Sequence, residues 1–186
     1  MSDLVLTDRF VLFWNGWPSQ WHPSPFEIEG LRYTCAEQFM MAEKARSFDD
    51  PDTERRIMAS DHPRAQKKLG RQVRGFNQQV WESLCLGIVF RANVAKFTAN
   101  PDLRAMLLAT AGKRMVEASP LDQVWGIGLA PDDPLARDES NWRGTNWLGL
   151  VLDHVRDHLQ NGRGLEAVCR DPNIAAQLAR RDAMRK

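Results

Sequence analysis

The chain of 186 residues has no apolar run close to the ~18 residues that a membrane-spanning helix needs. Its N-terminus lacks the basic stretch and apolar core of a secretory signal peptide. The three cysteines are widely spaced, odd in number and form no Cys-x-x-Cys pair, which argues against a disulfide framework or a zinc site. We therefore expect a cytoplasmic protein without a membrane partner.

Charge of one sign is also scarce, since 25 Lys and Arg stand against 24 Asp and Glu. No strong overall field draws this chain to nucleic acid or membrane. The sequence contains no Gly-x-Gly-x-x-Gly, no P-loop and no Gly-x-Ser-x-Gly. The four histidines show no metal-ligand spacing, and His154 and His158 are interpreted as surface residues. No metal and no cofactor is predicted.

Tryptophan, in contrast, is abundant: there are seven Trp and one Tyr. Trp14, Trp17 and Trp21 fall within eight residues, and Trp142 and Trp147 form a second group. Indole rings stack well on flat bases, so one interpretation is a base-binding cleft. The other interpretation is structural packing, and clustering alone leaves both open.

Helical patterns dominate the chain between short strands. Asp50-Pro51, His62-Pro63 and Asn100-Pro101 each predict a capping residue followed by the first helical position. Expected strands cover 10–14 and 115–118, a hairpin covers 26–34, and expected helices cover 36–48, 51–59, 63–70, a long segment after Asn77, a segment after 101, and 147–159. In the long helix, the expected core-facing residues are Trp81, Leu84, Ile88, Ala92 and Ala95.

The fold class is therefore predicted to be α+β and predominantly helical, with a few short strands and about six helices. Residues 1–160 are expected to form one domain, followed by a helical appendage over 161–186. Residues 119–146, rich in Gly, Pro, Asp and Trp, are predicted to be a long ordered loop. A loop of this length in a compact domain is often functional.

The helix over 36–48 offers a candidate acid–base pair. Glu37 and Lys44 stand at i and i+7, which places them within roughly 20° of each other around the axis. An acid and an amine that share a partly desolvated cleft shift each other's protonation. Acid–base groups and nucleophilic lysines are tuned in this way. The competing interpretation is a solvated helix face with ordinary charges.

Two further segments carry weaker signals. In Asp122-Gln123-Val124-Trp125-Gly126-Ile127-Gly128, the acid is either a catalytic group or the cap of its own turn. Asn146 is placed as a helix N-cap, and a phosphate could also bind at that helix start. The basic cluster at Gly70-Arg71 either holds a phosphate or complements the helix dipole.

Taken together, these segments resemble the NADAR family, also called YbiA-like. The resemblance covers roughly residues 10 to 160 and rests on the order of its motifs. These are Phe13-Trp14, Ser19-Gln20-Trp21-His22-Pro23-Ser24-Pro25-Phe26, Cys35-Ala36-Glu37-Gln38-Phe39-Met40-Met41-Ala42-Glu43-Lys44-Ala45, Gly70-Arg71, Trp81, Asn93-x-x-Lys96-Phe97, Leu107-Leu108-Ala109-Thr110, Val116-Glu117-Ala118, Trp125-Gly126-Ile127-Gly128 and Asn146-x-Leu148-Gly149.

The resemblance implies an N-glycosidase in a mostly helical domain. Its implied substrate is a small nucleotide-like molecule, either an early riboflavin-pathway intermediate or ADP-ribosylated guanine, the latter also in nucleic acid. Glu37 matches the essential glutamate of the family, and Lys44 matches a lysine thought to attack the anomeric carbon. The better-known bacterial members carry Glu-His-Tyr-Phe-Gln-Ala-Gln-Lys here, so this chain keeps the acid and the lysine and alters the surface between them.

The candidate catalytic residues are Glu37, Lys44 and Asp122. Asp122 would protonate the departing base or activate water. The candidate substrate-binding residues are Trp14, Gln20, Trp21, Arg71, Trp81, Trp125, Gly126, Gly128 and Asn146. Two alternatives remain from other functional classes, namely a non-catalytic reader of ADP-ribose or nucleotides, and a helical interaction domain without a small ligand.

Overall fold

The structure, a computed structural model, describes residues 4–172 and 176. Its strands are β1 (Leu4–Leu6), β2 (Phe10–Phe13), β3 (Phe26–Ile28), β4 (Leu31–Tyr33) and β5 (Arg114–Glu117). Its α-helices are α1 (Ala36–Ser47), α2 (Pro51–Met58), α3 (Pro63–Gly70), α4 (Gln78–Ala99), α5 (Pro101–Leu108), α6 (Trp147–Asn161) and α7 (Leu165–Cys169). The predicted α+β, predominantly helical class is confirmed.

Two compact units divide the chain, and each is described by itself. Unit 2 comprises residues 20–106, and unit 1 comprises residues 1–19 together with 107–186. The boundary falls within α5. Of the expected appendage over 161–186, the structure describes α7, while 173–175 and 177–186 lie outside the described residues. None of the described helices is long and apolar enough to cross a membrane.

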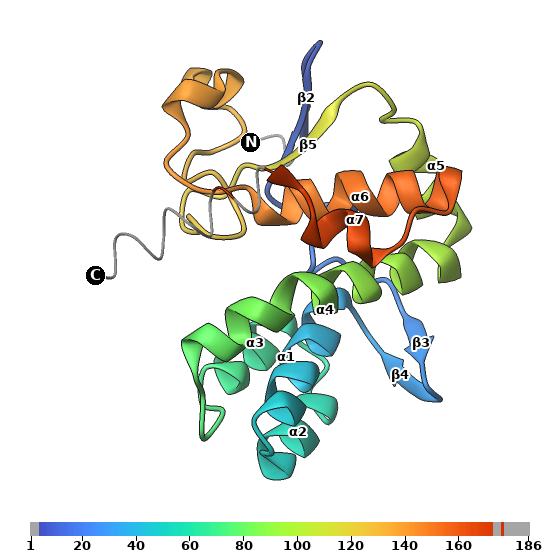
Figure 1. The fold of residues 1–186 in the computed structure, drawn as a ribbon, viewed down its shortest axis with the longest axis vertical. Coiled ribbons are helices and arrows are strands. Elements are labelled where there is room, and N and C mark those ends of the chain that lie inside the picture. Colours follow the sequence, from blue (N-terminus) through green and yellow to red (C-terminus); the bar gives the residue numbers. More distant parts are fainter. Residues whose placement is uncertain (1–3, 173–175, 177–186) are drawn as a thin grey trace. The chain divides into compact units, whose positions relative to one another are not determined.

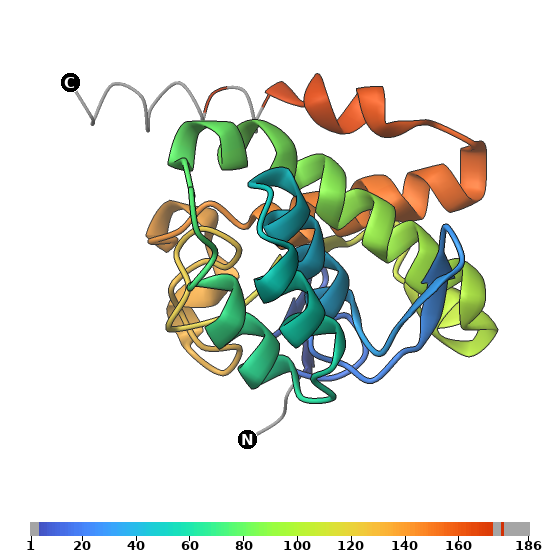
Figure 2. The same ribbon diagram turned by 90° about the horizontal axis from the view of Figure 1, so that it is seen from below.

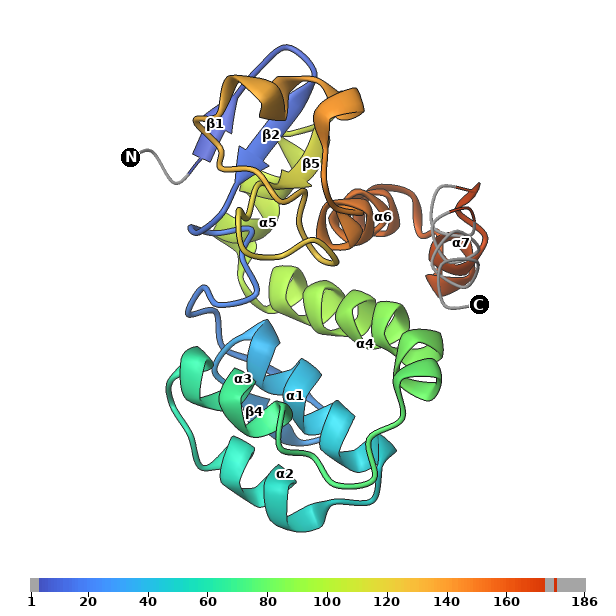
Figure 3. The ribbon, with the colours of Figure 1, turned by 90° about the vertical axis from the view of Figure 1, so that its left-hand side faces the viewer.

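Unit 2 is a group of helices with one hairpin. α1 contacts α2, α3 and α4, and Figures 1 and 3 show α1, α2 and α3 along one side of α4. β3 and β4 pair antiparallel around a turn at Glu29-Gly30, where both φ angles are positive. The hairpin lies beside the C-terminal end of α4 (Figure 2), where the Asn100 amide donates to the carbonyl of Pro25 at 3.1 Å.

Helix starts in unit 2 follow the expected chemistry. The Asp50 carboxylate accepts from the N–H of Thr53, and Pro51 takes the first helical position of α2. The Asn77 side chain accepts from two N–H groups in the first turn of α4. The core-facing stripe predicted on α4 is wrong at Leu84, whose side chain is 40% exposed. The adjacent Cys85 is buried instead, so the buried face of α4 is turned slightly from the predicted one.

Unit 1 is built on a three-stranded sheet in the order β1-β2-β5, visible in Figure 3. β1 pairs antiparallel with β2, while β2 pairs parallel with β5. All four residues of β2 are buried, as expected for a central strand covered on both faces. The sequence did not predict β1, a three-residue edge strand with only partial burial.

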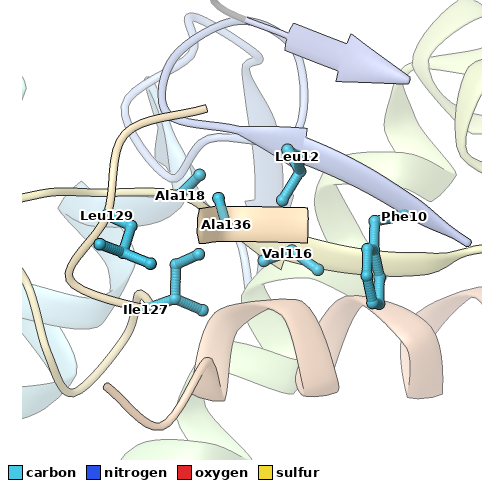
Figure 4. Packing of buried hydrophobic residues seen from close by; sticks show 7 residues of the cluster. All are labelled: Phe10, Leu12, Val116, Ala118, Ile127, Leu129 and Ala136. Carbon is cyan, nitrogen blue, oxygen red and sulfur yellow. The ribbon is translucent and has the colours of Figure 1, made fainter. Parts of the chain in front are cut away.

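The apolar core on one side of this sheet draws on distant segments. Figure 4 shows side chains of β2, of β5 and the residue that follows it, and of the long loop gathered in one cluster, namely Phe10, Leu12, Val116, Ala118, Ile127, Leu129 and Ala136. The 119–146 loop thus supplies core residues and contains two short 3-10 turns, Pro134–Arg137 and Glu139–Asn141. Burial of Ile127 and Leu129 explains why so long a connection is ordered.

One surface prediction in unit 1 is corrected. The His154 side chain is only 20% exposed, and its Nε2 lies 2.8 Å from the carboxylate of Asp171. His154 therefore pairs with the segment that follows α7 rather than facing solvent. His158 is partly exposed, and its Nδ1 lies 2.7 Å from the carbonyl of Arg163.

Candidate active site

Glu37 lies in the first turn of α1, where free N–H groups and the helix dipole favour a negative charge. Its side chain is buried, with the residue 5% exposed. Its backbone N–H donates to the carbonyl of Gln20 at 3.0 Å, which ties the preceding loop to the helix start. A buried carboxylate at a fixed helix terminus is a suitable acid–base or charge-stabilising group.

Two aromatic rings surround the amino group of Lys44. Its Nζ lies 4.0 Å from the centroid of the Phe76 ring and 5.5 Å from that of Trp81. Phe76 belongs to the α3–α4 loop and Trp81 to the first turns of α4, so three segments converge on one amine. Such ring faces attract an ammonium group while they also remove water from it.

The surroundings of Lys44 lower the pKa of its amine. Burial lowers the pKa of the amine below its ordinary value, and repulsion from Arg71 lowers it further. The charge of Glu37 acts in the opposite direction. The charge of Glu37 therefore acts on Lys44 across the two helical turns that separate them. A lysine with a lowered pKa has a larger nucleophilic fraction at neutral pH.

The end of α3 is held against α1 between these two residues. A Cβ atom added to Gly70 would lie 2.1 Å from Sδ of Met41, so only a glycine fits this contact without a shift. Met41 is four residues after Glu37 and three before Lys44. Arg71, which follows Gly70, is exposed and lies close enough to Lys44 for its charge to lower the pKa of that amine. A guanidinium in this position is well suited to hold a phosphate.

Gln20 and Trp21 precede the hairpin and belong to the same unit. The amide of Gln20 is buried, donates weakly to Sδ of Met40 at 3.8 Å, and accepts from Nδ2 of Asn93 at 2.8 Å. The Trp21 ring lies 5.8 Å from Nζ of Lys67 on α3. Gln20 therefore fixes the loop to α4, while Trp21 is positioned near a cation on α3.

Asn93 and Lys96 on α4 are polar groups that were not predicted as site residues from the sequence. Both are fully buried. Among the described residues, no donor reaches Oδ1 of Asn93. Burial lowers the pKa of Lys96 to about 7, and the pKa of His22 is lowered by burial first and by Lys96 second. The signal in the sequence was an Asn and a Lys at i, i+3 within an otherwise apolar stretch of helix.

The later candidates fall in unit 1. Oδ1 of Asp122 accepts from the N–H groups of Val124 at 3.0 Å and Trp125 at 2.9 Å, which is the geometry of the turn-capping interpretation. The Trp125 ring packs edge-on against Trp147, with 5.9 Å between centroids. Trp147 is fully buried, so this pair belongs in part to the core of unit 1.

Asn146 stands at the N-cap position of α6, yet the prediction that its side chain caps the helix is wrong. Its φ is +52°, in the left-handed region, and its amide makes no capping bond. Instead Nδ2 donates to the carbonyl of Met115 at 3.0 Å, and Oδ1 accepts from the N–H of Glu117 at 2.9 Å. The side chain therefore joins the start of α6 to β5.

The glycines of the long loop are crowded by protein. A Cβ at Gly126 would lie 2.7 Å from the carbonyl oxygen of Glu117 and 2.9 Å from that of Asp122. Gly128 has φ +72°, which favours glycine, and faces Arg143. Trp14, directly after β2, is 36% exposed and carries one of the more accessible indole rings of the described chain.

The structure therefore places the predicted residues in two sets. Glu37, Lys44, Arg71 and Trp81 converge within unit 2, with Gln20 and Trp21 in the same unit. Trp14, Asp122, Trp125, Gly126, Gly128 and Asn146 belong to unit 1. Phe76 was not predicted, because it is separated from Lys44 by 32 positions and no local spacing relates the two.

Comparison with known proteins identifies relatives over most of the chain. Residues 12–160 match the model of the NADAR domain. The chain is 42% identical over 167 residues to N-glycosidase R617 of Acanthamoeba polyphaga mimivirus, with 83% of this chain and 98% of that protein covered. It is 39% identical over 171 residues to Protein irg-1 of Caenorhabditis elegans, with 82% and 81% covered.

A solved structure shares the fold. The NMR structure of the Escherichia coli protein YbiA matches with a TM-score of 0.69 at 27% identity, and the match covers 85% of this chain and 89% of that chain. The family model spans most of the sequence, including the α1 pair and the α6 start. The family model over residues 12–160 and the similarity to these relatives show that the chain belongs to the NADAR domain family.

Proposed function

We propose that this protein is an N-glycosidase that hydrolyses the bond between a ribose and a base in a nucleotide-like substrate. The observation that carries the proposal is the amine of Lys44, which is partly buried between two rings and whose pKa is lowered by burial and by the charge of Arg71. The membership of this chain in the NADAR domain family and its similarity to a protein named as an N-glycosidase support the same reaction.

The chemistry begins at the anomeric carbon. Cleavage of an N-glycosidic bond develops positive charge on the ribose, and the buried Glu37 carboxylate stabilises that charge. Neutral Lys44 donates its lone pair to C1 as the bond to the base breaks, and the bonding electrons leave with the base, which takes up a proton from a general acid. The amine loses its own proton after attack.

The covalent intermediate is then resolved by water. The ring oxygen of the ribose takes up a proton as the sugar opens, which leaves an imine between C1 and Nζ of Lys44. Water adds to the imine carbon and releases the ribose as an aldehyde, which regenerates the amine. Arg71 would bind a phosphate carried by the ribose, and Trp81 would contact the flat part of the substrate.

We propose two candidate substrates. A ribose-phosphate aminopyrimidine of the riboflavin pathway and an ADP-ribosylated guanine both offer the required bond, a phosphate and a flat ring. Turnover of both compounds should be measured side by side. Tight binding without turnover, unaffected by Glu37→Gln, would instead favour the non-catalytic reader.

The imine supplies the sharpest test. Borohydride added during turnover should fix the ribose on Lys44 as a stable secondary amine that mass spectrometry locates. Lys44→Ala should abolish the adduct and the activity, and Glu37→Gln should lower kcat by on the order of 10²-fold or more. Lys68→Ala, at an exposed lysine of α3, is the matched control and should behave as wild type. Full activity in Lys44→Ala without any adduct would refute the mechanism.

A further inference from the structure

The loop between α3 and α4 is attached to the start of α2 by one buried acid. Asp50, which is 1% exposed, accepts from the backbone N–H of Arg74 at 2.9 Å. Its carboxylate also accepts from the guanidinium of Arg74 through Nε at 3.2 Å and through a terminal nitrogen at 2.8 Å. These hydrogen bonds hold the pKa of Asp50 well below its usual range.

Asp50 holds Arg74 through both the backbone N–H and the side chain of that residue. Asp50 caps α2 through Thr53 with the same oxygen that receives the guanidinium. The terminal nitrogen of Arg74 also lies 3.1 Å from Asp52. We refer to the contacts of Asp50 with Arg74 as the clamp. If Arg74 only balanced charge at the surface, its backbone N–H would not need the buried carboxylate of Asp50 as an acceptor.

Two residues beyond Arg74, the chain places Phe76 over Lys44. Gly75 between them has φ +67°, a left-handed conformation that turns the chain sharply. The Phe76 ring then packs against Phe48, with centroids 5.3 Å apart and planes at 64°. Its face lies 4.0 Å from Nζ of Lys44, although the Phe76 residue is 40% exposed.

We propose that Phe76 is a positioning residue that the Asp50–Arg74 clamp seats over the amino group of Lys44. The ring acts on the amine in two opposing ways. It excludes water, which disfavours the ammonium, and its negative face attracts the ammonium. The balance between these two effects sets the neutral fraction of the amine. The loop that carries Phe76 begins at Arg71, whose charge also lowers the pKa of Lys44.

This inference rests on the proposed function only for its catalytic meaning, since the state of the amine can be measured without any substrate. The rate at which Lys44 reacts with an amine-acylating reagent is followed across pH by mass spectrometry of the full chain. The midpoint of that profile reports the pKa of Lys44. Lys68, exposed on α3, is the internal reference for reagent decay.

Two substitutions at Phe76 separate its two effects. Phe76→Leu keeps an apolar cover but removes the aromatic face, so the midpoint should fall and the neutral fraction at a fixed pH should rise about two- to fivefold. Phe76→Ala admits water to the amine, so the midpoint should move upward toward the ordinary value. Because the side chain is partly exposed, neither change should prevent folding.

Breaking the clamp should reproduce the second effect at a distance. Arg74→Ala releases the loop and should move the midpoint upward, as Phe76→Ala does. Arg55→Ala is the matched control, since Arg55 is an exposed arginine whose ion pair is with Asp52, while that of Arg74 includes Asp50. It should leave the profile unchanged.

The outcomes divide cleanly. An unchanged midpoint in all Phe76 variants, or an equal shift in Arg55→Ala, would overturn the role of Phe76. Shifted midpoints together with full activity in Lys44→Ala would retain the positioning role and remove the imine mechanism. An imine adduct on Lys44 with no influence of Phe76 would do the reverse, so the two proposals fail separately.

Discussion

Asn146 supplies a stringent test of how unit 1 is held together. Asn146→Ala removes two hydrogen bonds and leaves the carbonyl of Met115 and the N–H of Glu117 without their partner. Two such losses cost about 2–4 kcal/mol when the abandoned groups stay out of water. Alanine at φ +52° adds about 1 kcal/mol, since asparagine tolerates the left-handed region better. The free energy of unfolding should therefore fall by about 3–5 kcal/mol.

Urea unfolding followed by tryptophan fluorescence measures this loss, because the fully buried Trp147 is the next residue. Asn146→Gly removes the same hydrogen bonds without the backbone strain, so it should be the milder change by about 1 kcal/mol. Asn161→Ala, at an exposed amide that donates to the carboxylate of Asp157, should stay within about 0.5 kcal/mol of wild type. A loss below about 1 kcal/mol for Asn146→Ala would refute the assigned bridging role.

Two buried groups predict opposite pH dependences. Burial raises the pKa of Asp153 to about 6 from an ordinary 3.8. The stabilising contribution of this group should therefore be fully present below pH 3.8 and be lost as the pH rises through 6. In Asp153→Asn, the urea concentration at the unfolding midpoint should no longer fall across that pH range. The pKa of Lys96 is lowered to about 7 from 10.5, so stability should increase as pH rises from 7 to 10.5. Lys96→Met should abolish that increase in thermal unfolding, and an unaltered slope would contradict the role of the buried amine.

Local chemistry explains what could be predicted from the sequence. The cap-and-proline pairs at Asp50-Pro51 and His62-Pro63 specify helix starts within four residues, and both starts are confirmed. The α1 pair was predicted from helical spacing, which depends on one element alone. The hairpin turn at Glu29-Gly30 is equally local.

Long-range contacts explain what could not be predicted. Asn146 resembles an N-cap in sequence, but its amide is used by a strand some thirty residues earlier. Phe76 lies over Lys44 although the two are 32 positions apart, and the loop that carries Phe76 is bonded through Arg74 to the residue that caps α2. The division into two units depends likewise on which distant segments meet, and no composition change marks residue 20 or residue 106.

The parallel pairing of β2 with β5 joins residues that are about a hundred positions apart. During synthesis, β2 leaves the ribosome long before β5 does. Residues 20–106 leave it in between and can already form the contacts within unit 2. Closing so large a loop is slow because the chain loses conformational entropy before the pairing of the two strands lowers the free energy. In nascent chains that end before residue 114, β2 should therefore lack β5 and have only β1 as a partner, and chaperones would find the apolar Phe10–Phe13 segment exposed there.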